Sequence, residues 1–184
     1  MNDLFYDLYR ITGRKDGFAF ITTFFRQRSF RYICYFRARQ KSRLLGFFVS
    51  PFSYLLNRKM SVEIPLSVRI GRGFLMIHPY GITMNSKTVV GSNFTILKGA
   101  TIGNTKSGKT PGCPLIGDNV YVGLNSTIVG GVHIGDNVMI AANTFVNFDV
   151  PEDSVVIGSP GVIHHKEKAS EPYINHSISE FNID

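Results

Sequence analysis

Five histidines and two cysteines are the residues of this chain most able to carry chemistry. Imidazole titrates near neutrality, so each histidine is a candidate for taking up or releasing a proton. His164, His165 and His176 lie in a polar C-terminal stretch without partners at metal-ligand spacing, and we assign them no chemistry and expect no metal site. His133 is expected on the surface. His78, taken by itself, fits a structural histidine at a turn as well as a base.

The cysteines and the apolar stretches indicate the compartment. Cys34 and Cys113 lie far apart and in no metal-ligand spacing, which is typical of free thiols in a reducing compartment. The first ten residues lack a signal-peptide pattern. The longest apolar stretch, residues 44–56, is interrupted by glycine, serine and proline and is too short to span a bilayer. We therefore expect a cytoplasmic protein.

A six-residue repeat dominates residues 88–149. The recurring aliphatic residues are Val90, Ile96, Ile102, Ile116, Val122, Ile128, Ile134, Ile140 and Val146. Residues 106–113 interrupt the repeat without changing its phase. A helix needs a period near 3.6 and a strand a period of 2, whereas six fits a short strand followed by a tight turn. The pattern predicts an all-β solenoid of stacked triangular coils with these residues inside, and not a β-sandwich.

The last position of each hexad supports this interpretation. These residues are Asn93, Gly99, Thr105, Asn119, Asn125, Gly131, Asn137, Asn143 and Asp149. All except Thr105 are types that tolerate positive φ, so we expect a tight turn at each. Upstream, Ile64, Ile70, Met76 and Ile82 lie six apart, and a two-residue slip follows Ile82. The solenoid is thus expected from residue 63 to about 150, with a closing strand and loop at 155–163.

Helices are expected before the repeat. The first covers residues 2–12, with Asn2 or Asp3 as its cap and Gly13 as its stop. A second is expected from a cap at Asp16 to about Arg43, and a third over residues 44–59, kinked or restarted at Pro51. The predicted domains are an N-terminal helical, basic and aromatic region at 1–62, a β-helix at 63–163 and a polar tail at 164–184.

Positive charge is concentrated in the helical region. Residues 1–62 hold twelve Lys and Arg against three Asp, a net +9, whereas the rest holds eight basic and ten acidic residues, a net −2. Three interpretations of residues 18–59 stay open. They form a cap on the solenoid or on a neighbouring subunit, they contact a membrane surface, or they bind nucleic acid. We favour the cap and expect no nucleic-acid partner, because no recognised motif accompanies the charge.

The segment EIPLSVRIGRGFLMIH at residues 63–78 resembles the entry to the repeat of serine O-acetyltransferases. The resemblance continues through Gly81-Ile82 and residues 95–103 to Gly158-Ser159-Pro160. The chain is similar to the hexapeptide-repeat acyltransferases, and to the serine and polysaccharide O-acetyltransferases among them. This resemblance implies a left-handed parallel β-helix, a hand that the period alone does not give. It also implies homotrimers with sites between neighbours, and acetyl transfer from acetyl-CoA to a hydroxyl.

The resemblance also implies roles for single residues. His78 falls at the position of the general base, and Glu63 replaces an aspartate that orients that base. The residues expected along acetyl-CoA are Gly103, Asn104, Gly123, Leu124, Ala141 and Ala142, with Pro160 near the adenine. Small residues there let the backbone approach the pantetheine arm, although glycine and alanine also suit turn geometry alone.

The expected acceptor pocket departs from the serine O-acetyltransferases. That family has an aspartate before the base and an Arg-His pair in the interrupting loop, where this chain has Ile77, Gly112 and Cys113. The two charge contacts of free serine are therefore missing. With Tyr80 in the same pocket, we expect a sugar hydroxyl of a surface polysaccharide or its lipid-linked precursor as the acceptor, at the inner face of the membrane. A serine O-acetyltransferase, an amino-sugar N-acetyltransferase and a non-catalytic β-helix scaffold stay open as alternatives.

Overall fold

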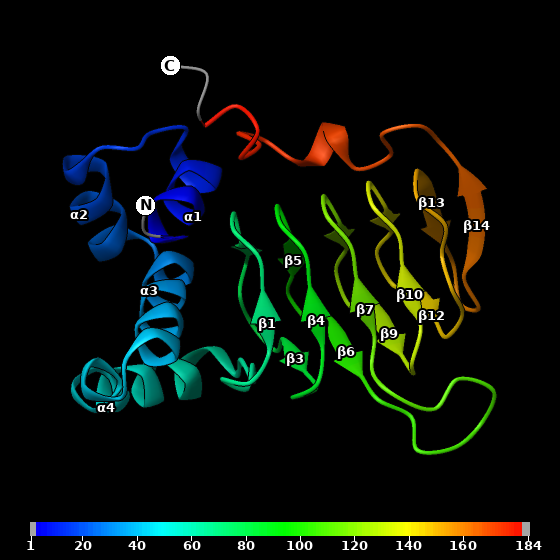
Figure 1. Ribbon diagram of the computed structural model, residues 1–184, viewed down its shortest axis with the longest axis horizontal. Helices are drawn as coiled ribbons and strands as arrows, with labels where there is room; N and C mark the ends of the chain where they lie inside the picture. The colour runs from blue at the N-terminus through cyan, green and yellow to red at the C-terminus, as the bar shows by residue number, and fades with distance from the viewer. Residues whose placement is uncertain (1–2, 182–184) are drawn as a thin grey trace.

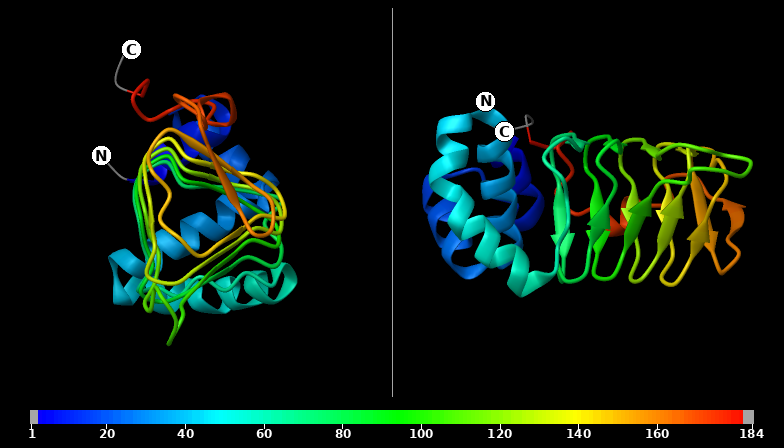
Figure 2. Two further views of the ribbon diagram at one scale, coloured as in Figure 1. Left: turned by 90° about the vertical axis from the view of Figure 1, so that its right-hand side faces the viewer. Right: turned by 90° about the horizontal axis from the view of Figure 1, so that it is seen from below.

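The structure is a computed structural model that describes residues 3–181, and it joins a group of helices to a coil of short strands (Figure 1). The helices are α1 (Asp3–Thr12), α2 (Gly17–Arg26), α3 (Arg28–Lys41) and α4 (Arg43–Met60). They cover the end of the coil where its first strands lie, and a C-terminal hairpin lies at the other end (Figure 2). The chain thus runs from helices through the coil to a tail that returns toward the helices.

The first two helices begin and end at residues with clear local causes. α1 stops at Gly13, which has a φ of +68°, as predicted, whereas the expected cap Asn2 lies outside the described residues. Asp16 caps α2 as predicted, because its Oδ1 accepts a hydrogen bond from Ala19 N at 2.9 Å. The side-chain oxygen satisfies a donor that has no partner within the helix.

One expectation about the later helices was wrong and another was confirmed. The single helix expected from Asp16 to Arg43 is broken at Gln27, which is extended at φ −111° and ψ 116°. The break turns α3 so that the Phe30 ring packs edge-on against Phe20, with centroids 5.2 Å apart. The helix expected over residues 44–59 is confirmed as α4, which passes through Pro51 without restarting and continues to Met60. Pro51 is exposed, so water can satisfy the carbonyl that the missing N–H leaves free.

The coil has three faces, because every third strand pairs in parallel with its predecessor. The β1 face holds β1 (Arg69–Ile70), β4 (Val89–Val90), β7 (Leu115–Ile116) and β10 (His133–Ile134). The β2 face holds β2 (Leu75–Ile77), β5 (Thr95–Leu97), β8 (Tyr121–Val122), β11 (Met139–Ile140) and β13 (Ser154–Ile157). The β3 face holds β3 (Thr83–Met84), β6 (Thr101–Gly103), β9 (Thr127–Val129) and β12 (Phe145–Val146). Seen along its axis the coil is triangular (Figure 2).

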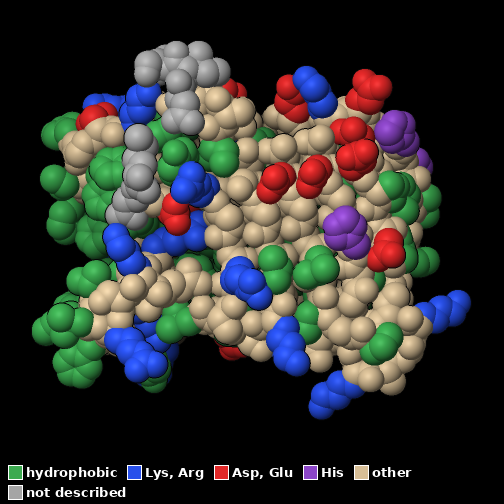
Figure 3. Space-filling model, in the orientation of Figure 1, with side chains coloured by type: hydrophobic (Ala, Val, Ile, Leu, Met, Phe, Trp, Pro, Cys, Tyr) green, Lys and Arg blue, Asp and Glu red, His purple; other side chains and the backbone are tan. Residues whose placement is uncertain are grey.

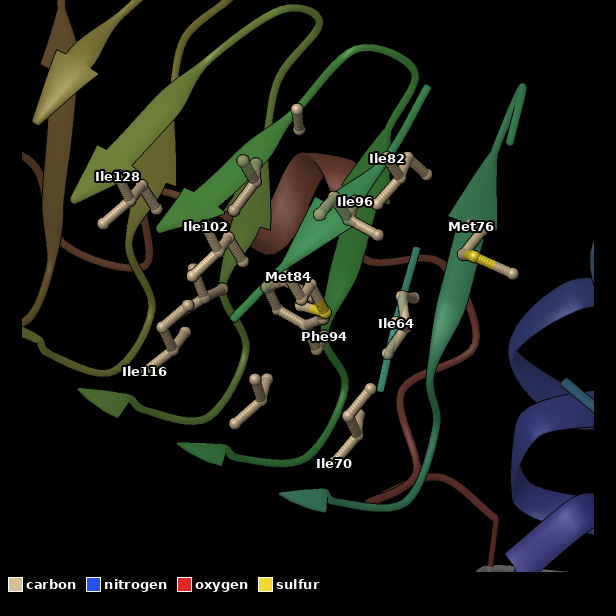
Figure 4. Packing of buried hydrophobic residues seen from close by; sticks show 14 of the residues in the cluster. Ile64, Ile70, Met76, Ile82, Met84, Phe94, Ile96, Ile102, Ile116 and Ile128 are labelled. Atoms are coloured by element: carbon tan, nitrogen blue, oxygen red, sulfur yellow. The ribbon is translucent and has the colours of Figure 1, made fainter. Parts of the chain in front are cut away.

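The core of the coil is the stack of recurring aliphatic residues. All nine predicted inward positions from Val90 to Val146 are at most 5% exposed. Figure 4 shows Ile96, Ile102 and their neighbours directed into the interior. Positive φ is confirmed at Asn93, Gly99, Asn119, Asn125, Asn137 and Asn143. It is not found at Gly131 or at Asp149. In the first case the preceding residue, Gly130, takes the left-handed conformation at φ +98°.

The two extra residues of the first coil lie at a different place from the one expected. Met76 pairs with Ile96 on the β2 face, and Met84 pairs with Ile102 on the β3 face. Because Met76 and Met84 are eight apart and their partners are six apart, the additional residues lie in the turn between β2 and β3. The expected slip after Ile82 was therefore wrong. Ile82 fits the six-residue spacing and is fully buried, which made it look like the inward strand residue. The inward strand residue of the β3 face is Met84.

The expected closing strand is a hairpin. β13 pairs antiparallel with β14 (Val162–His165), and residues 158–161 form the connecting turn with a cis Ser159–Pro160 bond. The following segment, which includes the 3₁₀-helix Glu171–Tyr173, returns along the coil toward α1 (Figure 1). The tail therefore packs against the coil as far as the described residues extend, to residue 181.

A ladder of asparagines supports this returning tail. Asn93 Nδ2 donates to Asn119 Oδ1 at 2.8 Å, and Asn119 Nδ2 donates to Asn137 Oδ1 at 3.0 Å. The tail attaches to the ladder because Ile178 N donates to Asn93 Oδ1 at 3.0 Å and Ser170 Oγ donates to the Asn119 carbonyl. Stacked corner residues thus serve both the turns and the docking of the tail.

The tail ends on α1. The Phe181 ring packs against Tyr6 and Tyr9, with ring centroids 4.3 Å and 5.3 Å apart. Lys15 Nζ donates to the Phe181 carbonyl at 3.1 Å. The last described residue of the chain therefore contacts its first helix.

A buried ion pair fixes the helices to the first coil. Arg37 of α3 contacts the Asp7 carboxylate of α1, with Nε 3.0 Å from Oδ2. The same guanidinium donates to the carbonyls of Ile70 at 2.7 Å and Gly71 at 2.6 Å, and Phe74 N donates to Asp7 at 2.8 Å. Two helices and the first coil thus share one hydrogen-bonded network.

None of the helices within residues 3–181 combines the length and the hydropathy needed to cross a bilayer. This agrees with the expectation for residues 44–56, which form part of α4 and are interrupted as predicted. α4 is nevertheless apolar over much of its exposed surface, with Phe47 75% exposed.

Candidate active site

His78 lies in the lengthened turn between β2 and β3. It directly follows β2, has a φ of +50° and is exposed. Non-glycine residues rarely adopt this conformation, and they often do so where a side chain must be presented in a particular direction. Backbone contacts hold the turn, since Tyr80 N donates to the His78 carbonyl at 2.7 Å and Gly99 N donates to the Tyr80 carbonyl at 2.8 Å. The two extra residues of the first coil thus shape the turn that presents His78.

A cavity of about 330 Å³ adjoins His78 where the coil meets the helices and the tail. Its lining residues are Arg10, Ile11, Gln27, Ser29, Leu75, Met76, Ile77, His78, Asn175 and His176. Arg10 is almost fully buried, and its guanidinium donates to Thr95 Oγ1 at 2.8 Å and to the Asn175 carbonyl. Burial lowers the pKa of Arg10 to about 10, so it remains cationic at neutral pH. Among residues 3–181 the lining contains no carboxylate, so this part of the cavity presents neutral polar groups, imidazole and one cation that is already engaged.

Glu63 lies on the strand segment beside the His78 turn. Glu63 N donates to the Ile82 carbonyl at 2.7 Å, and Gly81 N donates to the Met60 carbonyl at 2.9 Å. The exposed Glu63 side chain lines a separate cavity of about 500 Å³ under α4, together with Tyr54 and Asn57. No hydrogen bond joins Glu63 to His78 within the described residues, so their pairing stays a prediction. Catalytic hydrogen bonds are often loose before substrate binds.

Several predicted residues lie along one edge of the coil with His78. On the β2 face, the residues two positions after each inward strand residue stack along one edge, which we call the His78 edge. These residues are His78, Lys98, Leu124, Ala142 and Gly158. Asn125 N donates to the Lys98 carbonyl at 3.0 Å and Asn143 N to the Leu124 carbonyl at 2.8 Å, which joins successive coils. Gly123 and Ala141 precede Leu124 and Ala142, and Pro160 lies in the turn at the far end of the edge. Four of the predicted acetyl-CoA residues thus adjoin the His78 edge directly.

Other predicted residues lie on the opposite edge of the β3 face. Gly103 ends β6 and Asn104 follows it, and Gly112 and Cys113 belong to the loop between β6 and β7; we call this the loop edge. Gly112 pairs with Thr105 through two backbone hydrogen bonds of 3.0 and 3.1 Å, and Cys113 Sγ lies 3.0 Å from Asn85 Oδ1. Within one chain the expected acceptor pocket is therefore divided, with Ile77 and Tyr80 beside His78 and Gly112 and Cys113 on the loop edge. The Tyr80 hydroxyl accepts a hydrogen bond from Arg28 at 3.0 Å.

The small residues of the His78 edge also have a packing role. A methyl group at Gly123 would lie 2.7 Å from Ala142 N and 2.8 Å from the Ile140 oxygen. The next coil therefore requires glycine at this position whether or not a ligand is bound. Ala142 by contrast is exposed, and nothing in its backbone conformation demands a small side chain.

Most of the cavity lining was not found from the sequence, and neither was Lys98. Lys98 is exposed on the His78 edge one coil after His78. The sequence signal that could have found Lys98 is its position two residues after the inward Ile96, because His78 likewise lies two residues after Met76. His176 reaches the cavity only because the tail returns, and its ring lies 2.8 Å from the position of a methyl group on Gly13. No sequence pattern indicated that contact.

Of the remaining histidines, His133 is confirmed on the surface. His133, His164 and His165 are exposed, and no group of three His, Cys, Asp or Glu within residues 3–181 is arranged to hold a metal ion. Both cysteines are free thiols. Cys34 is buried among the helices, whereas Cys113 is half-buried on the loop edge. The Lys106 and Lys109 side chains are exposed in the loop.

Comparisons with known proteins identify the class. Residues 115–147 match the family described as the hexapeptide repeat of succinyl-transferase. The serine acetyltransferase of Helicobacter pylori strain 26695 is 32% identical over 128 residues, which are 69% of this chain and 75% of that protein. The chain therefore belongs to the hexapeptide-repeat acyltransferases. Within this superfamily it is close to the serine O-acetyltransferases, which confirms the resemblance.

Two further comparisons agree. The serine acetyltransferase of Synechococcus elongatus is 34% identical over 127 residues, 68% of this chain and 51% of that protein. The crystal structure of serine acetyltransferase from Brucella abortus strain S19 in complex with coenzyme A has a TM-score of 0.71 and 25% identity, over 89% of this chain and 67% of that one. The chain thus spans between about half and three quarters of the length of these relatives.

Proposed function

We propose that this chain catalyses acetyl transfer from acetyl-CoA to a hydroxyl group, with His78 as the general base. The observation that carries the proposal is the placement of an exposed His78 at the mouth of a cavity and on the same edge as Gly123, Leu124, Ala141 and Ala142. Membership of the hexapeptide-repeat acyltransferases and similarity to a coenzyme A complex support it.

The chemistry assigns a clear task to His78. An alcohol is a poor nucleophile at neutral pH, so a base must take its proton as the oxygen attacks the thioester carbonyl. A C–O bond then forms and the C–S bond breaks, and the imidazolium returns the proton to the departing thiolate of coenzyme A. General-base assistance of this kind contributes about 10²- to 10⁴-fold in rate. Glu63, on the neighbouring strand segment, would fix the imidazole tautomer once the two side chains meet.

The division of the site between two edges supports a trimer. One edge of the β3 face carries His78 and the other carries Asn104, Gly112 and Cys113. When three coils pack side by side, the His78 edge of one chain meets the loop edge of its neighbour, and the two halves form a groove. We propose that acetyl-CoA lies in this groove between left-handed coils, with Pro160 toward the adenine. In this proposal Glu63 pairs with His78, and the backbone groups of Gly103, Asn104, Gly123, Leu124, Ala141 and Ala142 lie along acetyl-CoA.

Serine is the acceptor that the relatives support, since those described above are serine acetyltransferases. The expected sugar acceptor finds no support in them, and serine takes precedence. A specific observation nevertheless favours a sugar hydroxyl as the second candidate. The described lining of the cavity beside His78 contains no carboxylate, and an α-ammonium group requires an anionic or strongly accepting partner. A polyhydroxyl acceptor needs neutral hydrogen-bonding groups such as Gln27, Ser29 and Asn175.

A panel of acceptors tests the proposal. Release of coenzyme A thiol is measured with serine, with amino sugars and with neutral sugars, for the unmodified protein and for His78→Ala and His133→Ala. We expect His78→Ala to lower the rate by about 10²- to 10⁴-fold and the exposed control His133→Ala to leave it unchanged. An unchanged rate in His78→Ala would remove the catalytic assignment of His78, whereas absence of turnover by the unmodified protein with every acceptor would favour a scaffold. Efficient turnover of serine would exclude the sugar alternative, and turnover of neutral sugars alone would exclude serine.

A further inference from the structure

α4 differs from an ordinary surface helix in that small side chains are buried and large apolar side chains are exposed. Its buried residues are Gly46, Ser53, Leu56 and Met60, and the first two are small. A methyl group on Gly46 would lie 3.5 Å from the Arg39 Cα, so α3 and α4 approach closely through small side chains. Large apolar side chains are consequently directed to the outside. A helix that only capped the coil would be expected to bury them.

The exposed side of α4 is a continuous apolar surface. We define the α4 apolar face as Leu44, Leu45, Phe47, Phe48, Phe52, Tyr54 and Leu55, each between 49% and 75% exposed. At about 100° per residue Leu44, Phe48 and Leu55 lie on the side of the helix opposite Gly46 and Ser53, and the other four flank them on either side. α2 adds Phe18, Ile21 and Phe25 at 70%, 59% and 71% exposure. Both groups gather at the end of the molecule away from β14 (Figure 3).

Basic side chains surround this apolar surface. Arg43 begins α4, Arg58 and Lys59 lie near its end, and Lys41 and Arg26 lie close by in sequence, all of them exposed. The acidic residues of the helical region are already engaged: Asp3 contacts Arg72 at 2.9 Å, Asp7 contacts Arg37 at 3.0 Å, and Asp16 contacts Arg14 at 2.9 Å. The excess charge of this end is therefore positive, in agreement with the net +9 of residues 1–62.

We propose that the α4 apolar face, with the exposed side of α2, binds the surface of an anionic lipid bilayer. Phenylalanine and leucine would enter the boundary between headgroups and acyl chains while the flanking cations contact lipid phosphates. Charge complementarity selects this occupant. A second copy of the same face would bring Arg43, Arg58 and Lys59 against their equivalents, and like charges at an interface are unfavourable.

The proposal predicts a defined orientation. The helices cover the first coil, so binding through α4 and α2 would make the coil extend away from the bilayer. His78 would then lie in the coil nearest to the bilayer (Figure 1). The hairpin of β13 and β14 then lies at the distant end. This inference concerns binding only and does not depend on the acetyl transfer proposed above.

Vesicle flotation of the full chain tests the proposal. The vesicles contain phosphatidylcholine alone or phosphatidylcholine mixed with phosphatidylglycerol. We expect the protein to float with the anionic vesicles, and the double variant Phe47→Ser, Phe48→Ser to bind them at least about tenfold more weakly. A second double variant, Arg58→Glu and Lys59→Glu, should lose the preference for anionic vesicles, and salt should weaken binding by the unmodified protein. Val162→Ser, which alters an apolar residue 56% exposed at the opposite end, is the matched control and should bind normally.

Three results would overturn the proposal. The first is absence of flotation by a protein whose circular dichroism spectrum is that of a folded chain. The second is equal binding to neutral and anionic vesicles. The third is a change of oligomeric state in Phe47→Ser, Phe48→Ser without any lipid binding by the unmodified protein, which would make this face an interface between copies.

Discussion

At the scale of single residues, the turn that holds His78 shows where prediction from the sequence ended. The role proposed for His78 was indicated by the surrounding segment, because the resemblance extends over residues 63–78, and it stays a prediction. The shape of the turn was not indicated. Ile82 is aliphatic and buried, so it satisfied the six-residue phase and hid the true inward residue, Met84. A periodic pattern cannot distinguish two buried aliphatic residues that lie two positions apart.

Cys34 provides a prediction about pH at this scale. Burial raises the pKa of the Cys34 thiol to about 12, whereas an unfolded cysteine titrates near 8.5. The folded state thus favours the protonated thiol, and this contribution to stability is complete below the unfolded pKa and is lost as pH rises toward 12. We expect the unmodified protein to lose about 1.4 kcal/mol of stability per pH unit between pH 9 and 11 relative to Cys34→Ala.

Urea unfolding at several pH values measures this difference. Subtracting the Cys34→Ala curve removes the titration of Tyr32 and Arg10, which the two proteins share. A difference that stays constant with pH would contradict the assignment of Cys34 as a thiol protonated by burial.

At the scale of elements, the helical region shows where local signals end. Asp16 and Gly13 act through their immediate neighbours, and both were predicted. The break at Gln27 was not, because glutamine is a good helix former and the break serves the packing of Phe30 against Phe20. The Asp7–Arg37 pair was also beyond prediction, since it joins residues from two helices.

The Asp7–Arg37 pair supports a prediction about stability. Burial raises the pKa of Asp7 even though Arg37 opposes this effect, so removing Arg37 would leave a poorly solvated carboxylate. We expect Arg37→Ala to lower the free energy of unfolding by about 3 to 5 kcal/mol, because it breaks a buried pair by deleting one partner. Chemical denaturation measures the change. The matched control is Arg14→Ala, whose pair with Asp16 is exposed and whose loss should change stability little. Equal effects of the two substitutions would show that the network does not fix the helices to the coil.

At the scale of the whole molecule, the solenoid was predictable and its assembly with the tail was not. The six-residue period was enough to predict the solenoid, because each coil must bury an aliphatic residue at the same positions. The path of the tail depends on contacts such as Phe181 with Tyr6, which join opposite ends of the sequence and follow no period. The division of the site between two edges likewise emerged only from the positions of the faces.

The proposed trimer leads to a prediction about mixtures. If each site uses the His78 edge of one chain and the loop edge of its neighbour, a His78→Ala chain and a Gly112→Trp chain should each be inactive alone. Dissociating and reassembling the two together should restore part of the activity, because some sites then receive two unaltered halves. Light scattering checks that the assemblies contain three chains. Mixtures that remain inactive while trimers form would contradict a shared site.

The returning tail has a consequence for how the molecule comes apart. A stack of repeats contacts only its neighbours, so its ends can open independently of one another. Here residues 166–181 connect the final hairpin to the asparagine ladder and then to Tyr6 and Tyr9 of the first helix. The covalent chain and these contacts thereby link the last coil back to the first helix. Opening of the last coil disturbs the docking of the first helix, so the protein should unfold as one cooperative unit instead of unravelling from either end.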